Sequence, residues 1–292
     1  MALTEKDRHL SAYVNMTSDQ AVADFLHHRN LVRGISVAMV LVLAAVLVWM
    51  MTWTVVNLIP AFLIAYLIVL VTEVLEIRKA WVGLLGILSY DRDPQKLLEV
   101  VSPLLDRFSS KKRTSTMLET WYGLCSVLLG YPDVALAWAE KASRRGPSDA
   151  YWISILGVRT SAFAMLDDET ALLAARSQLE KLLENNASKA NLAKAARLSL
   201  DSVDETLAER RGDWTTALQK IGAIDALITT PQQEVVNVLR EAHVCAGQGD
   251  MANAAQLYAF VGANGGTCAF RADAQRWLEA NGYAPAQVTG QE

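Results

Sequence analysis

The sequence predicts an all-α protein in which a transmembrane helical hairpin precedes an α-solenoid of about five helix pairs. Two observations predict this fold. The stretch from Ile35 to Leu75 contains a single charged side chain, Glu73, and such a run is long enough for two membrane-spanning helices. Beyond residue 80, apolar residues recur at helical spacing, and the alternation that is typical of strands is absent.

The first segment, residues 1–34, is expected to be cytoplasmic and to contain a short interfacial helix. Ser18 and Asp19 can cap this helix, and its apolar side chains gather on one side. These side chains are Ala21, Val22, Phe25, Leu26 and Val32. His27 and His28 lie about 100° apart around a helix, so we assign them no metal.

Two membrane spans are predicted, over residues 35–53 and 58–75. At about 1.5 Å per residue, each covers roughly 27 to 29 Å, close to the hydrocarbon thickness of about 30 Å. Their connection carries no Lys or Arg. Basic residues instead flank the spans, with Arg29 and Arg33 before the first and Arg78 and Lys79 after the second. We therefore expect a two-pass protein of the cell membrane with both termini in the cytoplasm.

Glu73 lies within the second apolar span, where an acid is by default a candidate for proton or ion movement. It lies about one helical turn from the cytoplasmic end, and the first span offers no second acid or His as a relay partner. We therefore expect an interfacial carboxylate. Since no Pro or Gly follows Glu73 until Gly83, one helix is expected to run from the membrane into the first repeat.

The charge of the remaining chain excludes one class of partner. From Glu76 onward there are 23 basic and 26 acidic residues, with no long run of one sign, whereas a nucleic-acid surface needs a basic excess. The three cysteines, Cys125, Cys245 and Cys268, form no metal-ligand or disulfide pattern. We expect them to be buried thiols.

Catalytic signatures are absent from the sequence. There is no G-x-S-x-G, P-loop, G-x-G-x-x-G or H-E-x-x-H motif. Gly265 and Gly266 lie in an Asn/Thr loop that follows no strand, and His243 has no nucleophile or acid partner in sequence. We therefore predict no enzymatic activity, no catalytic residue, no metal and no cofactor.

Two patterns recur after the second span. Trp is followed by small and aliphatic residues at Trp81, Trp121 and Trp152. A Gly followed by a polar residue and a small Ala recurs at Gly130, Gly212 and Gly249. Each Gly is expected to end one helix in a left-handed conformation before a capped second helix.

These residues resemble the tetratricopeptide repeat (TPR) family, whose units are pairs of antiparallel helices of about 34 residues. The resemblance covers residues 80–283, and residues 284–292 are expected to form a loose tail. The small residue that the family places after the first-helix Leu is replaced by Leu85, Cys125 and Leu156. A related helical solenoid is the close alternative.

The resemblance implies a concave groove, lined by first helices, that binds a partner protein or peptide. Mapped onto this chain, the groove residues are Tyr122, Ser126, Ile153, Gly157, Asp201, Glu205, Leu239 and His243. The two acids suggest a partner segment that carries Lys or Arg. The expected function is a membrane scaffold or adaptor. The alternatives are an accessory subunit of a membrane transporter or enzyme, or an envelope-assembly factor if the topology is reversed.

Overall fold

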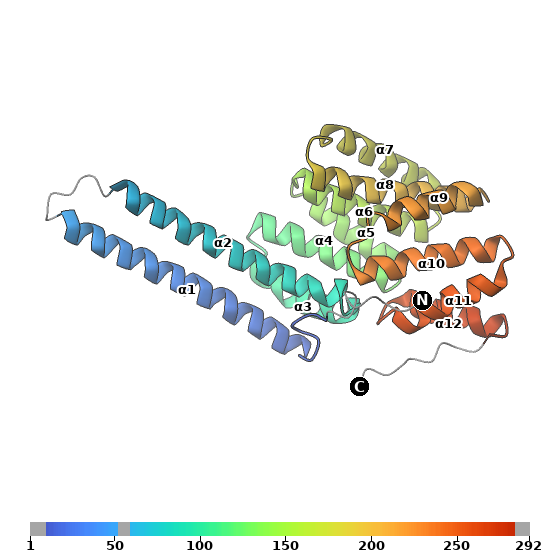
Figure 1. The fold of residues 1–292 in the computed structure, drawn as a ribbon, viewed down its shortest axis with the longest axis horizontal. Coiled ribbons are helices and arrows are strands. Elements are labelled where there is room, and N and C mark those ends of the chain that lie inside the picture. Colours follow the sequence, from blue (N-terminus) through green and yellow to red (C-terminus); the bar gives the residue numbers. More distant parts are fainter. Residues whose placement is uncertain (1–9, 52–58, 284–292) are drawn as a thin grey trace. The chain divides into compact units, whose positions relative to one another are not determined.

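The computed structural model describes residues 10–51 and 59–283, and this part of the chain is all-α, with twelve helices and no strand (Figure 1). Their bounds are α1 Ser18–Met51, α2 Ile59–Ser89, α3 Pro94–Phe108, α4 Lys112–Leu128, α5 Pro132–Ser143, α6 Asp149–Met165, α7 Glu169–Asn185, α8 Ala190–Arg210, α9 Trp214–Asp225, α10 Pro231–Gly247, α11 Met251–Asn264 and α12 Ala269–Ala280. The predicted tail lies outside the described residues. The chain divides into a hairpin unit, Ser11–Gly86, and an array unit that begins at Ile87.

The hairpin unit begins with one long helix. Thr17 caps α1, because its hydroxyl accepts from the Gln20 backbone N–H (3.2 Å) while the Gln20 side chain accepts from the Thr17 N–H (2.9 Å). The predicted interfacial helix is not a separate element, since α1 runs unbroken from Ser18 to Met51. Two of the apolar residues assigned to that helix, Ala21 and Phe25, are instead fully buried within the protein.

Two contacts show that α1 and α2 are antiparallel. The Phe25 and Trp81 ring centroids lie 4.4 Å apart, and Arg33 Nε lies 3.7 Å from Glu73 Oε1. The interfacial carboxylate therefore has a cationic partner that the sequence did not reveal. Trp81 was predicted to open the first repeat, but it packs inside the hairpin unit because α1 supplies its aromatic neighbour.

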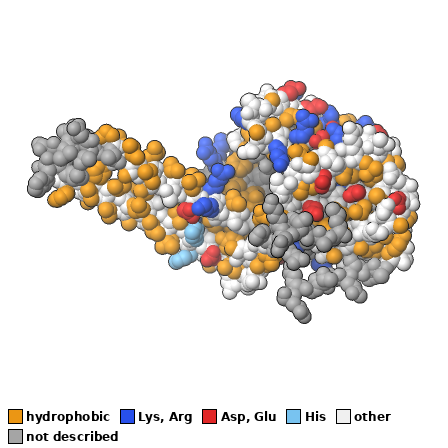
Figure 2. Space-filling model, viewed as in Figure 1, with side chains coloured by type: hydrophobic (Ala, Val, Ile, Leu, Met, Phe, Trp, Pro, Cys, Tyr) orange, Lys and Arg blue, Asp and Glu red, His pale blue; other side chains and the backbone are white. Residues whose placement is uncertain are grey.

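Hydrophobic side chains cover much of the hairpin unit (Figure 2). Among the described residues, α1 is the one helix that is long and apolar enough to cross a membrane, and only 6% of its most apolar window is buried. The second predicted span is helical from Ile59 onward, and its crossing of a membrane stays a prediction. The expected continuous helix is present over Ile59–Ser89, and its passage from a membrane into a first repeat stays a prediction.

One turn geometry recurs in the array unit after the even-numbered helices. The residues that follow α4, α6, α8, α10 and α12 have positive φ, and the next N–H donates to the carbonyl five residues earlier, at 2.8–3.0 Å. These left-handed residues are Gly130, Asp167, Gly212, Gly249 and Gly282. The predicted left-handed conformation of the three repeated glycines is thus confirmed, and Asp167 adds a unit that the glycine pattern missed.

The helices that follow three of these turns are capped alike, whereas α5, after Gly130, has no side-chain cap and the predicted cap there is wrong. The side chains of Asp168, Asp213 and Asp250 accept hydrogen bonds from the backbone N–H three residues later, at 2.9–3.3 Å. Asp93 caps α3 in the same way, after Arg92 with φ 56°. An Asp at this position satisfies an otherwise unpaired donor and favours the helix dipole. The array is therefore built from repeated helix pairs.

Small residues let consecutive helices approach closely. From α3 to α12 each helix packs on the next, and α6 also packs on α4 and α8. One buried cluster joins α5 and α6 through Ala135, Ala139, Ala142, Ile155, Val158 and Ala162. A longer cluster of Leu, Ala and Val joins α6, α7 and α8. Burial of these apolar side chains is the main stabilisation of the array.

The loop between α11 and α12 contacts the turn that precedes α3. Thr267 donates its N–H to the Arg92 carbonyl (3.1 Å) and its hydroxyl to Asp93 Oδ1 (2.8 Å), across 174 positions. Gly266 makes this approach possible, because a Cβ there would lie 1.9 Å from the Arg92 carbonyl oxygen. The glycine-rich loop noted in the sequence therefore holds the two ends of the array together.

Gly266→Ala tests this closing contact. We expect it to lower the free energy of unfolding by about 3 kcal/mol, since the methyl group meets the Arg92 carbonyl in addition to the strain of positive φ. Gly212→Ala is the matched control, because Gly212 also has positive φ (68°) but open space around its Cβ position. It should cost only about 1 kcal/mol. Equal losses in urea unfolding would contradict the closing contact.

Candidate partner-binding site

The eight predicted groove residues lie on four first helices of the array. They are Tyr122 and Ser126 on α4, Ile153 and Gly157 on α6, Asp201 and Glu205 on α8, and Leu239 and His243 on α10. Since α6 packs on both α4 and α8 and Arg240 of α10 pairs with Glu205 of α8, these helices are neighbours in sequence order. The structure thus brings the predicted elements together.

Two of the uncharged positions have little surface. Ile153 is 2% exposed and belongs to the buried cluster of α6, α7 and α8. Ser126 is 1% exposed, and its hydroxyl donates to the Tyr122 carbonyl (2.9 Å). Both side chains therefore stabilise the array internally.

The other uncharged positions are half-buried, except His243. The Tyr122 ring packs against Trp138 with centroids 4.4 Å apart, and Leu239 packs against the core cluster of α10, α11 and α12. Gly157 faces Ser199. The His243 side chain is 42% exposed and its Nδ1 lies 3.7 Å from Glu209 Oε1. His243 therefore offers more accessible polar surface than Ser126, Asp201 or Glu205.

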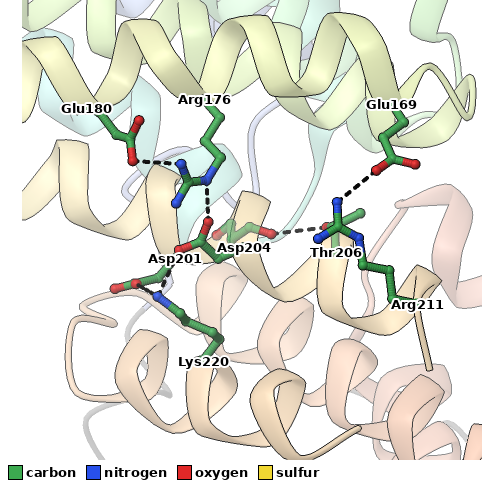
Figure 3. Close-up of polar contacts among 9 residues, drawn as sticks. Glu169, Arg176, Glu180, Asp201, Asp204, Thr206, Arg211 and Lys220 are labelled. Atoms are coloured by element: carbon green, nitrogen blue, oxygen red, sulfur yellow. Dashed lines mark hydrogen bonds and ion pairs between the residues drawn. The ribbon is translucent and has the colours of Figure 1, made fainter. Parts of the chain in front are cut away.

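Asp201 belongs to a charged network that joins α7, α8 and α9 (Figure 3). Lys220 Nζ donates to Asp201 Oδ1 (2.9 Å) and Asp204 Oδ2 (2.8 Å), and Arg176 donates to Asp204 (2.6 Å) and Glu180 (2.6 Å). Burial alone would raise the pKa of Asp204, but the hydrogen bonds from Arg176 and Lys220 lower it. The network therefore holds Asp204 ionised as an internal tie between three helices.

Glu205 lies deeper and is less well paired. Its Oε2 is 3.4 Å from Arg240 Nε, and its Oε1 has no hydrogen-bond partner among the described residues. Burial raises the pKa of Glu205 to about 7, against partial compensation by Arg240. Burial also lowers the pKa of Arg240. Both shifts mean that the attraction within this pair does not fully offset the hydration that the two groups lose.

The two carboxylates are therefore not a surface for a basic partner, as the sequence had suggested. Asp201 is 4% exposed and Glu205 is 1% exposed, and each faces a cation of the same chain. The reason is that α8 packs against three helices, α6, α7 and α9. Its apolar stripe and its polar face are consequently both covered.

Glu119 is a third buried carboxylate, and it was not predicted from the sequence. Glu119 of α4 accepts two hydrogen bonds from Arg145, both 2.8 Å, and lies 3.7 Å from Lys141 Nζ. These hydrogen bonds to the Glu119 carboxylate raise the pKa of Arg145. No local pattern predicts this pair, because Arg145 follows α5 and lies 26 positions away.

Two of the three cysteine thiols are buried as predicted, whereas Cys245 is only partly buried. Burial raises the pKa of the Cys268 thiol to about 12, so it is neutral at pH 7. Cys125 is fully buried as well. Over residues 10–51 and 59–283, no group of three or more His, Cys, Asp or Glu side chains is arranged to hold a metal ion. The charged side chains of the array instead join its helices.

Comparison with protein-family models, with curated proteins and with solved structures finds no match. The TPR resemblance therefore rests on the residues and helices of this chain alone.

Glu205→Gln tests the internal carboxylate through its pH dependence. A folded-state pKa of about 7 against 4.5 in the unfolded chain means that the folded state binds the proton more tightly, so stability falls as pH rises through 7. Between about pH 5 and about pH 8.5 we expect the native chain to lose about 2 kcal/mol more than the Gln variant.

The measurement is urea unfolding in detergent at the two pH values, with the exposed Glu184→Gln as control. If the free energy of unfolding changed equally with pH in the native chain and in Glu205→Gln, the raised pKa of the buried Glu205 carboxyl would be contradicted.

Proposed function

We propose that the chain is a membrane-anchored scaffold or adaptor that binds partner proteins at the cytoplasmic face of the membrane. The observation that carries the proposal is the uncovered apolar surface of α1 and α2. Large hydrophobic side chains are exposed along both helices, at Leu31, Ile35, Val37, Met39, Leu41, Val42, Val46, Val48, Trp49, Leu63, Ile64, Tyr66, Leu67, Ile68, Leu70, Val71, Val74 and Leu75.

A surface of this kind is costly in water. Each Å² of apolar surface transferred from water gains about 25 cal/mol, and soluble monomers rarely expose large contiguous apolar patches. The 34 residues of α1 extend about 51 Å, more than the hydrocarbon thickness of about 30 Å. A bilayer could therefore cover the apolar part of α1 and leave its first turns in water.

We extend the anchor to two spans, residues 35–53 and 58–75. The antiparallel contacts of α1 and α2 support this extension, since the apolar surfaces of both helices then end together near Arg33 and Glu73. Arg78 and Lys79 come shortly after this end of the apolar surface in the sequence. In the positive-inside orientation, both termini and the helix pairs are cytoplasmic.

The repeated turns support a TPR-like solenoid as the binding part. Left-handed C-terminal residues and Asp caps recur from pair to pair, and stacked pairs of this type present extended surfaces for peptides. Of the eight groove residues, we retain Tyr122, Gly157, Leu239 and His243 as contact candidates, because the other four are buried. The proposed partners are proteins or peptides, with no enzymatic activity, cofactor or nucleic acid.

The second candidate function is an accessory subunit of a membrane transporter or membrane enzyme. The same apolar surface favours it, because partner spans could cover α1 and α2 as well as lipid does. An envelope-assembly factor remains the alternative for the reversed topology.

Membrane fractionation tests the anchor. The full chain should stay in the membrane pellet after alkaline carbonate extraction, and its release into the supernatant would contradict a spanning anchor.

Reporter fusions at Glu292 test the topology. Green fluorescent protein should fluoresce there, and alkaline phosphatase should be inactive, because both report a cytoplasmic terminus. An active phosphatase would reverse the topology and favour the envelope-assembly reading.

Co-purification of the full chain in mild detergent separates the scaffold from the accessory subunit. For a scaffold, His243→Ala should reduce recovery of a partner by fivefold or more, or about 1 kcal/mol of binding. Lys181→Ala, an exposed change on α7, should not. For an accessory subunit, Leu67→Ala with Val71→Ala should release a membrane partner instead. Unchanged recovery in both variants would contradict both assignments.

A further inference from the structure

Charged side chains gather where the apolar surface of the hairpin unit ends (Figure 2). The contacts of Arg33 with Glu73 and of Phe25 with Trp81 share one register, in which increasing numbers on α1 meet decreasing numbers on α2. In this register the segment from His27 to Arg33 faces the segment from Glu73 to Lys79. Two helices therefore contribute charges to the same level.

The cations of this level lie further outward than the acids. In the Arg33–Glu73 pair, the exposed fractions of the side chains are 44% for Arg33 and 23% for Glu73. In the Lys79–Glu76 pair, they are 71% for Lys79 and 36% for Glu76. Arg78 is exposed too. Each carboxylate is thus turned toward the helices, and the guanidinium or ammonium group forms the outer surface.

The neighbouring groups keep this outer surface cationic. Lys79, with a smaller contribution from His28, lowers the pKa of Glu76, so Glu76 stays ionised and attracts Lys79. His27 is exposed and His28 is half-buried at the same level. Asp24, the nearest further acid on α1, is exposed but lies one turn beyond His28, further from the apolar surface.

We propose that Arg33, Arg78 and Lys79 form a collar that binds the phosphate groups of anionic phospholipids. The inference rests on the proposed membrane anchor, since lipid must first cover the adjoining apolar surface. The occupant follows from two neighbouring surfaces. The exposed apolar side chains Ile35, Val74 and Leu75 adjoin the collar, so one lipid can place its chains on them and its phosphate on the cations.

The full chain in detergent-free vesicles provides the test. Spin-labelled phosphatidylglycerol and phosphatidylcholine report which lipid is held at the protein surface. The three cations of the collar and the carboxylates of Glu73 and Glu76 leave a net charge of +1 at this level, and one positive charge near an anionic surface strengthens attraction by about fivefold. We expect the native chain to prefer phosphatidylglycerol by roughly fivefold, and Arg78→Gln with Lys79→Gln to reduce this preference below about twofold. Lys181→Gln with Arg197→Gln, exposed changes in the array unit, should leave it unchanged.

The outcomes separate the collar from the anchor. Insertion into both vesicles without a lipid preference would overturn the collar and leave the anchor intact. A failure to insert into either vesicle would overturn the anchor, and the collar with it. A preference that soluble glycerol phosphate abolishes would assign the cations to free phosphate and overturn lipid binding. A preference that both double variants retain equally would overturn the assignment to Arg78 and Lys79.

Discussion

The uncovered apolar surface of α1 and α2 is the constraint on which the account depends. In the array unit, apolar side chains from consecutive helices form buried clusters, so the helices of the array bury each other's hydrophobic surfaces. In the hairpin unit, α1 and α2 cover each other mainly near Phe25 and Trp81. Beyond Arg33 and Glu73, Ser36 and Val69 are buried but many large hydrophobic side chains are exposed, and in the proposed function a bilayer covers them.

Much of the fold was predictable, because helix ends depend on local chemistry. A Gly that needs positive φ, followed by an Asp cap, identified the turns at Gly212 and Gly249 from a few adjacent residues. The turn at Asp167 carries no glycine and so falls outside the glycine pattern, although the consecutive acids Asp167, Asp168 and Glu169 suit a turn and a helix start. Contacts between distant segments were harder still. The partner of Trp81 lies on α1, and Thr267 meets Asp93 across 174 positions.

The candidate site was predicted less well, for a related reason. The sequence of a single helix cannot reveal how many neighbours that helix has. Because α6, α7 and α9 pack against α8, Asp201 and Glu205 are internal partners of Lys220 and Arg240. Those cations belong to α9 and α10, so only the packed structure shows that the carboxylates are occupied. All eight residues lie on α4, α6, α8 or α10, and their role in binding a partner stays a prediction.

The most direct test of the central claim is an accessibility scan of single spin labels along α1 in lipid vesicles, from Leu26 to Val48. Oxygen concentrates in the bilayer core, whereas a water-soluble nickel chelate is excluded from it. The account predicts that labels before Arg33 are reached by the chelate, and that labels beyond Ile35 are reached by oxygen alone. Access of the chelate along the whole helix, or protection from both reagents, would contradict an apolar surface that lipid covers.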